Sequence, residues 1–143
     1  MTTTLTDQAT PVLSNEVKAF LDEVQPAIIG TIRADGSVQM NPIWYERRED
    51  ELWLNPATSR RWGTRLDPGA RVTLLMVDPG NMWRWVQIQA AVVEKTQAGG
   101  EDHIDRLSRR YLGRDYVKHV PDDPRLVVRV RPERVTGMFA DVA

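Results

Sequence analysis

Cysteine is absent from the 143-residue chain, which excludes disulfides, thiolate nucleophiles and zinc sites built on cysteine. Histidine occurs only at His103 and His119, too few and too far apart for metal or triad chemistry. We therefore predict structural roles for both, with no metal site and no catalytic dyad. No apolar run approaches the ~20 residues that a membrane helix needs, and the amino-terminal segment lacks the pattern of a signal peptide. A cytoplasmic protein without membrane contact is the expectation.

Lysine is also scarce, because only three of the 19 basic residues are lysine and the other 16 are arginine. The net charge of −1 argues against a general nucleic-acid binder. Arginine matches phosphate and carboxylate with a planar fork, so a local cluster would indicate an anion site. The total count fits a coding bias toward arginine equally well, and only the position of a cluster can decide between the two.

The order of short apolar runs and turns predicts one mainly β domain over residues 14–143, preceded by a polar, flexible arm over residues 1–13. A helix is expected from Ser14 to just before Pro26, and an amphipathic helix from Glu101 to Leu112, ended by Gly113. Arg60–Leu66 is expected to form a helical turn. The predicted strands are Ala27–Arg33, Val38–Glu46, Glu51–Asn55, Ala70–Asp78, Met82–Lys95, Arg125–Arg131 and Glu133–Phe139. This pattern favours a mostly antiparallel barrel with peripheral helices.

The longest predicted strand has two unlike faces. Strand alternation places Val86, Ile88, Ala90 and Val92 on one side, which suits a barrel interior. The other side carries Trp83, Trp85, Gln87 and Gln89. Two indoles beside two amides favour a subunit interface or a flat ligand, since aromatic residues are enriched at interfaces. A surface patch covered by the chain's own helix is the alternative.

A second informative segment runs from Asn55 to Trp62, where a strand ends and a helical turn is expected to begin. Thr58 and Ser59 bring hydroxyls, and Arg60 and Arg61 bring two adjacent guanidinium groups. Backbone N–H groups, hydroxyls and guanidinium forks together can hold a phosphate. A solvated pair of surface arginines is the competing interpretation.

The ordered segments TIRADGSVQMNPIWYE, LWLNPATSRRW, ARVTLLMVDPGNMWRWVQIQA, RYLGRDY and VVRVRPERVTGM resemble the flavin/deazaflavin oxidoreductase family. This is the group with the pyridoxamine 5′-phosphate oxidase-like, FMN-binding split β-barrel. The sequence is similar in particular to its probable coenzyme F420-dependent branch. The resemblance spans about residues 27–138 and implies a mainly β split barrel with peripheral helices.

The resemblance also implies where a cofactor would bind. Ser59, Arg60 and Arg61 match the family's phosphate-gripping Ser-Arg-Lys, with arginine in place of lysine. The segment Gln39–Trp44 matches the strand that lines the ring, and Ala90 stands where the family usually has glycine. The residues nominated for cofactor binding are Gln39, Asn41, Pro42, Ile43, Trp44, Asn55, Ser59, Arg60, Arg61, Trp62, Trp85 and Gln87.

By this resemblance the protein is expected to be an F420-dependent oxidoreductase that transfers a hydride from reduced deazaflavin to a small unsaturated or conjugated substrate. A homodimer with the cofactor between its subunits is implied. No catalytic residue is nominated, because nothing in the sequence singles out Tyr45 or Tyr111 as a proton donor. Two alternatives stay open. One is an FMN-binding, pyridoxamine 5′-phosphate oxidase-like flavoprotein, and the other a non-catalytic binder of flavin, deazaflavin or haem.

Overall fold

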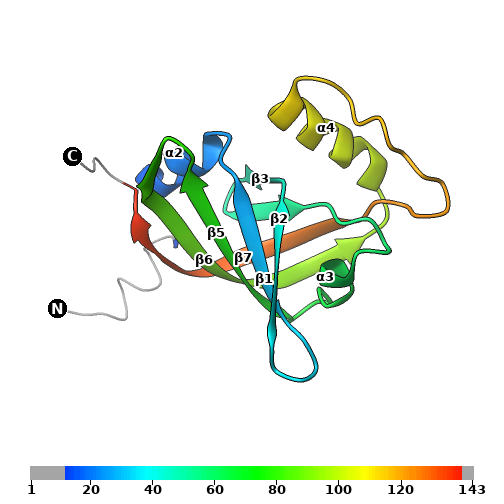
Figure 1. Cartoon of the computed structure of the whole chain (residues 1–143), viewed down its shortest axis with the longest axis horizontal. Helices are drawn as coiled ribbons and strands as arrows, with labels where there is room; N and C mark the ends of the chain where they lie inside the picture. Colours follow the sequence, from blue (N-terminus) through cyan, green and yellow to red (C-terminus); the bar gives the residue numbers. More distant parts are fainter. Residues whose placement is uncertain (1–11, 140–143) are drawn as a thin grey trace.

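The computed structural model describes residues 12–139 (Figure 1). Residues 1–11 of the predicted arm lie outside this range, so the prediction of a flexible arm concerns mainly residues that the structure does not describe. Leu13, at the end of that predicted arm, is buried in the hydrophobic core. The folded part therefore begins slightly earlier than the polar composition of the first residues indicates.

Seven antiparallel strands in the described range form one curled sheet, in the order β2-β1-β5-β6-β7-β4-β3 (Figure 1). The strands are β1 Ala27–Ile32, β2 Val38–Ile43, β3 Tyr45–Arg48, β4 Glu51–Leu54, β5 Arg71–Asp78, β6 Asn81–Thr96 and β7 Val127–Met138. The helices are α2 Asn15–Asp22, α3 Arg61–Thr64 and α4 Gly100–Leu112. The prediction of a mainly β split barrel with peripheral helices is confirmed.

The sheet curls because its two edge strands are joined by a single residue. β2 and β3 lie at opposite ends of the strand order, yet only Trp44 separates them in sequence. Consecutive Cα atoms are about 3.8 Å apart, so the two edges must approach within about 7 Å at this point. The predicted single strand Val38–Glu46 was therefore wrong, and the break at Trp44 closes one end of the barrel. Pro42 is tolerated because β2 is an edge strand, where a missing N–H costs little.

Two other boundaries differ from the prediction. Arg125–Arg131 and Glu133–Phe139 were expected as separate strands, but β7 runs unbroken from Val127 to Met138. Next to Pro132 the pairing with β6 shifts register, so that Glu133 has no partner on β6. The helical turn expected over residues 60–66 is shorter, because α3 spans only Arg61–Thr64.

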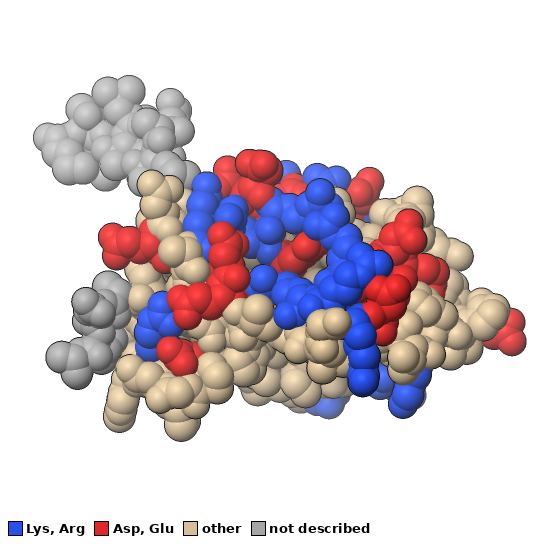
Figure 2. All heavy atoms as spheres, turned by 90° about the horizontal axis from the view of Figure 1, so that it is seen from above, with Lys and Arg blue, Asp and Glu red and all other residues tan. Residues whose placement is uncertain are grey.

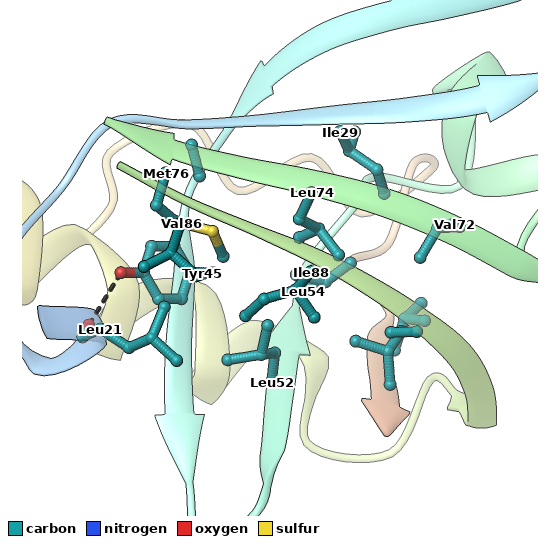
Figure 3. Close-up of a cluster of buried hydrophobic side chains, with 14 of the residues drawn as sticks. Leu21, Ile29, Tyr45, Leu52, Leu54, Val72, Leu74, Met76, Val86 and Ile88 are labelled. Atoms are coloured by element: carbon teal, nitrogen blue, oxygen red, sulfur yellow. Dashed lines mark hydrogen bonds between the residues drawn. The ribbon is translucent and has the colours of Figure 1, made fainter. Parts of the chain in front are cut away.

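The barrel interior contains the predicted face of β6, since Val86, Ile88, Ala90 and Val92 are all buried. Figure 3 shows part of this core, in which leucine, valine and methionine side chains from β4, β5 and β6 meet. Each large aliphatic side chain that leaves water here stabilises the fold by roughly 1.5–3 kcal/mol. Ala90 faces this interior, so its methyl group replaces glycine in the core and does not narrow an outer ligand surface.

Helix α2 is tied to the barrel by a buried phenol. The Tyr45 hydroxyl donates a hydrogen bond of 2.8 Å to the Leu21 carbonyl, as the dashed line in Figure 3 marks. Burial raises the pKa of Tyr45 well above its usual range. Ser14 caps the helix, because its Oγ accepts a hydrogen bond of 3.2 Å from the Val17 N–H. The hydroxyl proton of Tyr45 therefore serves to hold α2 against the barrel.

The face that carries α2 and α4 shows basic and acidic side chains interleaved (Figure 2). Arg47 pairs with Asp22 at 2.7 Å, and Arg84 pairs with Glu23 at 2.5 Å. Some of the arginines on the surface are therefore paired with carboxylates of the chain itself. No helix among residues 12–139 is long and apolar enough to cross a membrane.

Candidate functional site

A cavity of about 750 Å³ opens where the end of β2, the turn before α3, and α4 with its following segment meet. This volume lies within the range of about 300–1,000 Å³ that is usual for small-molecule sites. The cavity combines an apolar and aromatic surface with a few polar groups, as ligand sites generally do. Its lining includes Ile28, Asn41, Pro42, Ile43, Trp44, Asn55, Arg60, Trp62, Ile104, Tyr111, Tyr116 and Arg125.

The cavity brings together part of the nominated set. The nominated residues that line it are Asn41, Pro42, Ile43, Trp44, Asn55, Arg60 and Trp62. They come from two segments that sequence reasoning treated separately, namely the end of β2 and the turn after β4. The curl of the sheet places these segments on one side of the same hollow.

The other nominated residues lie elsewhere in this chain. The Gln39 side chain accepts a hydrogen bond of 2.5 Å from Arg65, a residue that the sequence analysis did not nominate. Arg61 is exposed on α3 and is not part of the cavity lining. Trp85 and Gln87 lie on β6, on the side of the sheet opposite the barrel interior. Their predicted role therefore depends on whether a ligand extends over that outer side.

Trp44 anchors an aromatic cluster at one end of the cavity. Its ring stacks on Tyr111 with centroids 5.4 Å apart and meets Tyr116 edge-on at 6.3 Å. The Tyr111 hydroxyl donates to the Gln25 carbonyl at 2.9 Å, and burial raises the pKa of Tyr111. Because Tyr45 and Tyr111 both donate to backbone carbonyls, neither has a free proton for a ligand in this arrangement.

Arg125 connects the aromatic cluster to the turn after β4. Its Nη1 donates to the Asn55 carbonyl at 3.0 Å, and its Nη2 donates to the Tyr116 hydroxyl at 2.6 Å. The guanidinium also lies 4.7 Å from the centroid of the Tyr116 ring. Sequence reasoning missed Arg125 and Tyr116 as cavity residues, because both belong to the long connection between α4 and β7, whose course carries no periodic signal.

Ser59, nominated as a phosphate ligand, already has a partner within the chain. Its N–H donates to Asp123 Oδ1 at 2.8 Å, and its hydroxyl donates to Asp123 Oδ2 at 2.6 Å. Hydrogen bonds from Ser59 lower the pKa of Asp123, and the positive charges of Arg125 and Arg60 add to this effect. The turn therefore does stabilise an anion, and in this structure that anion is a carboxylate of the protein itself.

Asn55 is held by a buried polar network behind the cavity. Its Nδ2 donates to the Gly100 carbonyl at 2.8 Å and lies 3.1 Å from His103 Nδ1. His103 Nδ1 must then accept, so the imidazole proton lies on Nε2, which is 3.1 Å from Glu46 Oε1. Burial acts to raise the pKa of Glu46, but hydrogen bonds from His103 and Arg106 outweigh it and lower that pKa. The network fixes the orientation of the Asn55 carboxamide.

The second histidine, His119, holds the connection between α4 and β7 against α4. His119 Nδ1 lies 2.7 Å from Glu101 Oε1, and its Nε2 lies 2.9 Å from Asp105 Oδ1. Hydrogen bonds to these two carboxylates raise the pKa of His119. Asp105 also accepts from the Tyr116 N–H at 2.9 Å, so this cluster sets the position of Tyr116. No group of side chains with metal-ligand geometry occurs among residues 12–139.

Two amide oxygens in the cavity lining are buried without a partner. Asn41 Oδ1 and Asn55 Oδ1 accept no hydrogen bond from any described residue. Both oxygens are also excluded from solvent, so the open cavity does not present them to a ligand in this structure. The groups that the lining does offer are the Trp44 ring and the Arg60 guanidinium, which suit a flat ligand with an anionic substituent.

Comparisons with known proteins agree with this architecture. The family model described as pyridoxamine 5′-phosphate oxidase matches residues 13–139. A structure named F420 reductase superposes with a TM-score of 0.72 at 22% identity, covering 83% of this chain and 94% of that one. An FAD and haem binding protein from Mycobacterium smegmatis superposes with a TM-score of 0.62 at 18% identity, covering 91% and 75%. At these identities the structures show the fold alone.

A further structure, General Stress Protein 26 from Bacillus anthracis, has a TM-score of 0.60 at 12% identity, covering 84% of this chain and 88% of that one. No protein of curated function matches the sequence.

Proposed function

Because the chain belongs to the pyridoxamine 5′-phosphate oxidase family, we propose that it is a coenzyme F420-dependent oxidoreductase acting on a small unsaturated or conjugated substrate. The observation that carries this proposal is the cavity between β2 and α4, which joins an aromatic end to a cationic end. When bound, the reduced deazaflavin supplies the hydride that the substrate receives. The protein supplies position, exclusion of water and electrostatics.

The roles of the chain's own residues follow from their places in the cavity. Trp44 offers an indole ring to a flat ligand, and Asn41 and Asn55 add polar side chains to the lining. Arg60 lines the cavity and Arg61 follows it, so both can attract the phosphate, with Arg60 the nearer of the two.

A homodimer is the assembly that we propose, because the cavity continues onto an uncovered apolar surface. In the sheet register Pro42, Ile28, Leu75 and Gln87 lie side by side across β2, β1, β5 and β6. Pro42 and Ile28 line the cavity, and Gln87 lies two strands from Ile28, about 10 Å away. Large exposed apolar side chains on β1, β2 and β6 surround this row, namely Ile32, Val38, Met40 and Trp83. A second copy over this face would enclose a ligand that reaches Trp85 and Gln87.

A substitution at Trp85 tests whether the protein forms this homodimer. Trp85→Glu would bury an unpaired charge against the second copy, and we expect the variant to be monomeric at micromolar concentration. Light scattering measures the mass directly. Gln89→Glu, which places the same charge on the more exposed end of the same face, is the control. A dimeric Trp85→Glu protein would contradict the proposed interface.

An FMN-binding flavoprotein on the same barrel is the alternative that the family supports. Haem binding through histidine would require this chain to break existing contacts, because His103 is engaged with Asn55 and Glu46, and His119 with Glu101 and Asp105. The cavity chemistry therefore favours a flat heterocycle with an anionic tail over histidine-ligated haem.

The deciding experiment titrates the purified protein separately with oxidised F420 and with FMN, following the fluorescence of its five tryptophans. Trp44 and Trp62 line the cavity, so a bound ring will quench them. Saturable quenching by F420 alone supports the deazaflavin reductase. Preference for FMN assigns the protein to the flavin branch, and an absence of response to both contradicts the proposal.

A further inference from the structure

We propose that Asp123 is a built-in competitor for the anionic group of the ligand, occupying the donors of Ser59 until a phosphate displaces it. This inference rests on the proposed function, because Ser59 adjoins Arg60, which lines the cavity and is proposed to attract the phosphate. Its basis is the paired contact already described, in which both carboxylate oxygens take the N–H and the hydroxyl of Ser59. Two oxygens of a phosphate would take the same two donors.

The surroundings of Asp123 are those of an anion site. Arg60 and Arg125, the two arginines of the cavity lining, both act on the Asp123 carboxyl through their positive charges. A ligand phosphate that reaches Arg60 therefore enters a field in which one negative charge is already present. The two anions repel each other, so the carboxylate rotates away and leaves the donors of Ser59 to the phosphate.

The backbone of the turn does not depend on the Asp123 side chain. The Thr58 N–H and hydroxyl both donate to the Pro124 carbonyl, at 3.0 Å and 2.7 Å. The Leu126 N–H donates to the Pro56 carbonyl at 2.9 Å. These bonds keep the two segments together when the carboxylate leaves, so displacement requires rotation of one side chain and no movement of the loop.

Competition of this kind lowers the apparent affinity for a phosphate-bearing ligand, because only the fraction of molecules in which Ser59 is free can bind it fully. The penalty falls only on ligands that carry the anionic group, so Asp123 also acts as a specificity-determining residue. Removing the carboxylate will tighten binding of a phosphate-bearing ligand by about tenfold, if the competent fraction is roughly one in ten in the wild type.

The experiment compares ligands that differ in their anionic group. FMN and riboflavin differ by the phosphate alone, whereas F420 and its phosphate-free ring compound differ by the phosphate together with the anionic tail attached to it. Tryptophan quenching gives dissociation constants for the wild type, Asp123→Ala, and the matched control Asp122→Ala, whose carboxylate is exposed and has no hydrogen-bond partner among the described residues. Asp123→Asn, which keeps the shape and removes the charge, is a second variant should the alanine variant fold poorly.

We expect Asp123→Ala to bind the phosphate-bearing member of a pair more tightly and the phosphate-free member as the wild type does. Asp122→Ala should match the wild type for both. In a Ser59→Ala background the gain from Asp123→Ala should be smaller, because one of the two contested donors, the hydroxyl, is absent and only the N–H remains. Weaker binding in Asp123→Ala, an equal change for both members, or an undiminished gain without the Ser59 hydroxyl would overturn the proposal.

Inorganic phosphate separates this inference from the proposed function. If no ring compound binds the wild type, the proposed function fails, and the phosphate dependence of the thermal midpoint still decides the competition. A larger rise in midpoint for Asp123→Ala than for the wild type supports it. An equal rise, or none in either protein, overturns it.

Discussion

The two walls of the cavity are built by different forces. The wall formed by β2 and the turn after β4 is held by the sheet, since β2 pairs with β1 from Ile32↔Val38 to Ala27↔Ile43. The wall formed by α4 and residues 113–126 depends on long-range side-chain contacts, such as His119 with Glu101 and the Arg125 N–H with Glu101 at 2.6 Å. Backbone ladders are cooperative, whereas exposed ion pairs each contribute little.

This difference predicts where the site is tolerant and where it is vulnerable. The sheet wall gives the ligand a rigid surface, because displacing β2 requires breaking several backbone hydrogen bonds together. The helical wall can loosen one contact at a time.

Gly100→Ala should have the largest effect, because it forces apart the two segments of the helical wall, α4 and the chain at Arg125. A methyl group at Gly100 would lie 1.9 Å from the Arg125 carbonyl oxygen, which is backbone and cannot rotate away. We expect a loss of about 3 kcal/mol in the free energy of unfolding, measured by urea denaturation. Gly36→Ala is the control, because Gly36 has no neighbour within 4 Å and only its φ of 88° opposes a side chain. Equal losses in the two variants would show that α4 is not in close contact with Arg125.

Arg60→Ala should have the next largest effect, on ligand affinity and not on stability. Loss of one charge-assisted contact with a phosphate corresponds to about 1.5–3 kcal/mol, or at least a tenfold weaker F420 affinity. Arg61→Ala should weaken binding less, because Arg61 is absent from the cavity lining. The sequence resemblance assigns phosphate binding to Arg61, whereas the cavity lining contains Arg60. Comparing the two variants decides between these two assignments.

The control for that pair is Arg71→Ala, whose side chain is 80% exposed and lies outside the cavity lining. Arg110 is unsuitable as a control because it donates to the backbone carbonyls of Leu21, Glu23 and Tyr45. Arg110→Ala would therefore lower stability and confuse the comparison. If Arg61→Ala weakens binding more than Arg60→Ala, the cavity geometry does not describe the phosphate site.

The sheet wall was largely predictable from the sequence, and the helical wall was not. Period-2 alternation identified the buried face of β6, and the residues Asn41, Pro42 and Ile43 at the end of β2 were nominated. Alternation cannot reveal that one residue, Trp44, ends β2 and begins the opposite edge. Tyr116, Arg125 and Asp123 were not predicted as site residues, because their positions depend on contacts with residues distant in sequence. Arg125, for example, contacts Asn55, which lies 70 positions away.

The smallest and most specific effect expected is that of His119 on the pH dependence of stability. Its pKa is raised above the ordinary 6.5 by hydrogen bonds to Glu101 and Asp105. A raised pKa in the folded state adds stability that is fully present below 6.5 and is lost as the pH rises through the folded-state value. The lowered pKa values of Glu101 and Asp105 act in the acidic range instead, where stability is lost as the pH falls.

The free energy of unfolding should therefore decrease as the pH rises from about 6 toward 8, by less than about 1 kcal/mol because the cluster is partly exposed. Urea denaturation at a series of pH values measures this slope. His119→Gln, which keeps a polar side chain without a titrating ring, should flatten the slope in that window. The contact of His119 with the Tyr116 ring, at a centroid distance of 5.6 Å, means that this loss also loosens the aromatic end of the cavity. A variant with the same slope as the wild type would show that the His119 cluster does not hold the helical wall.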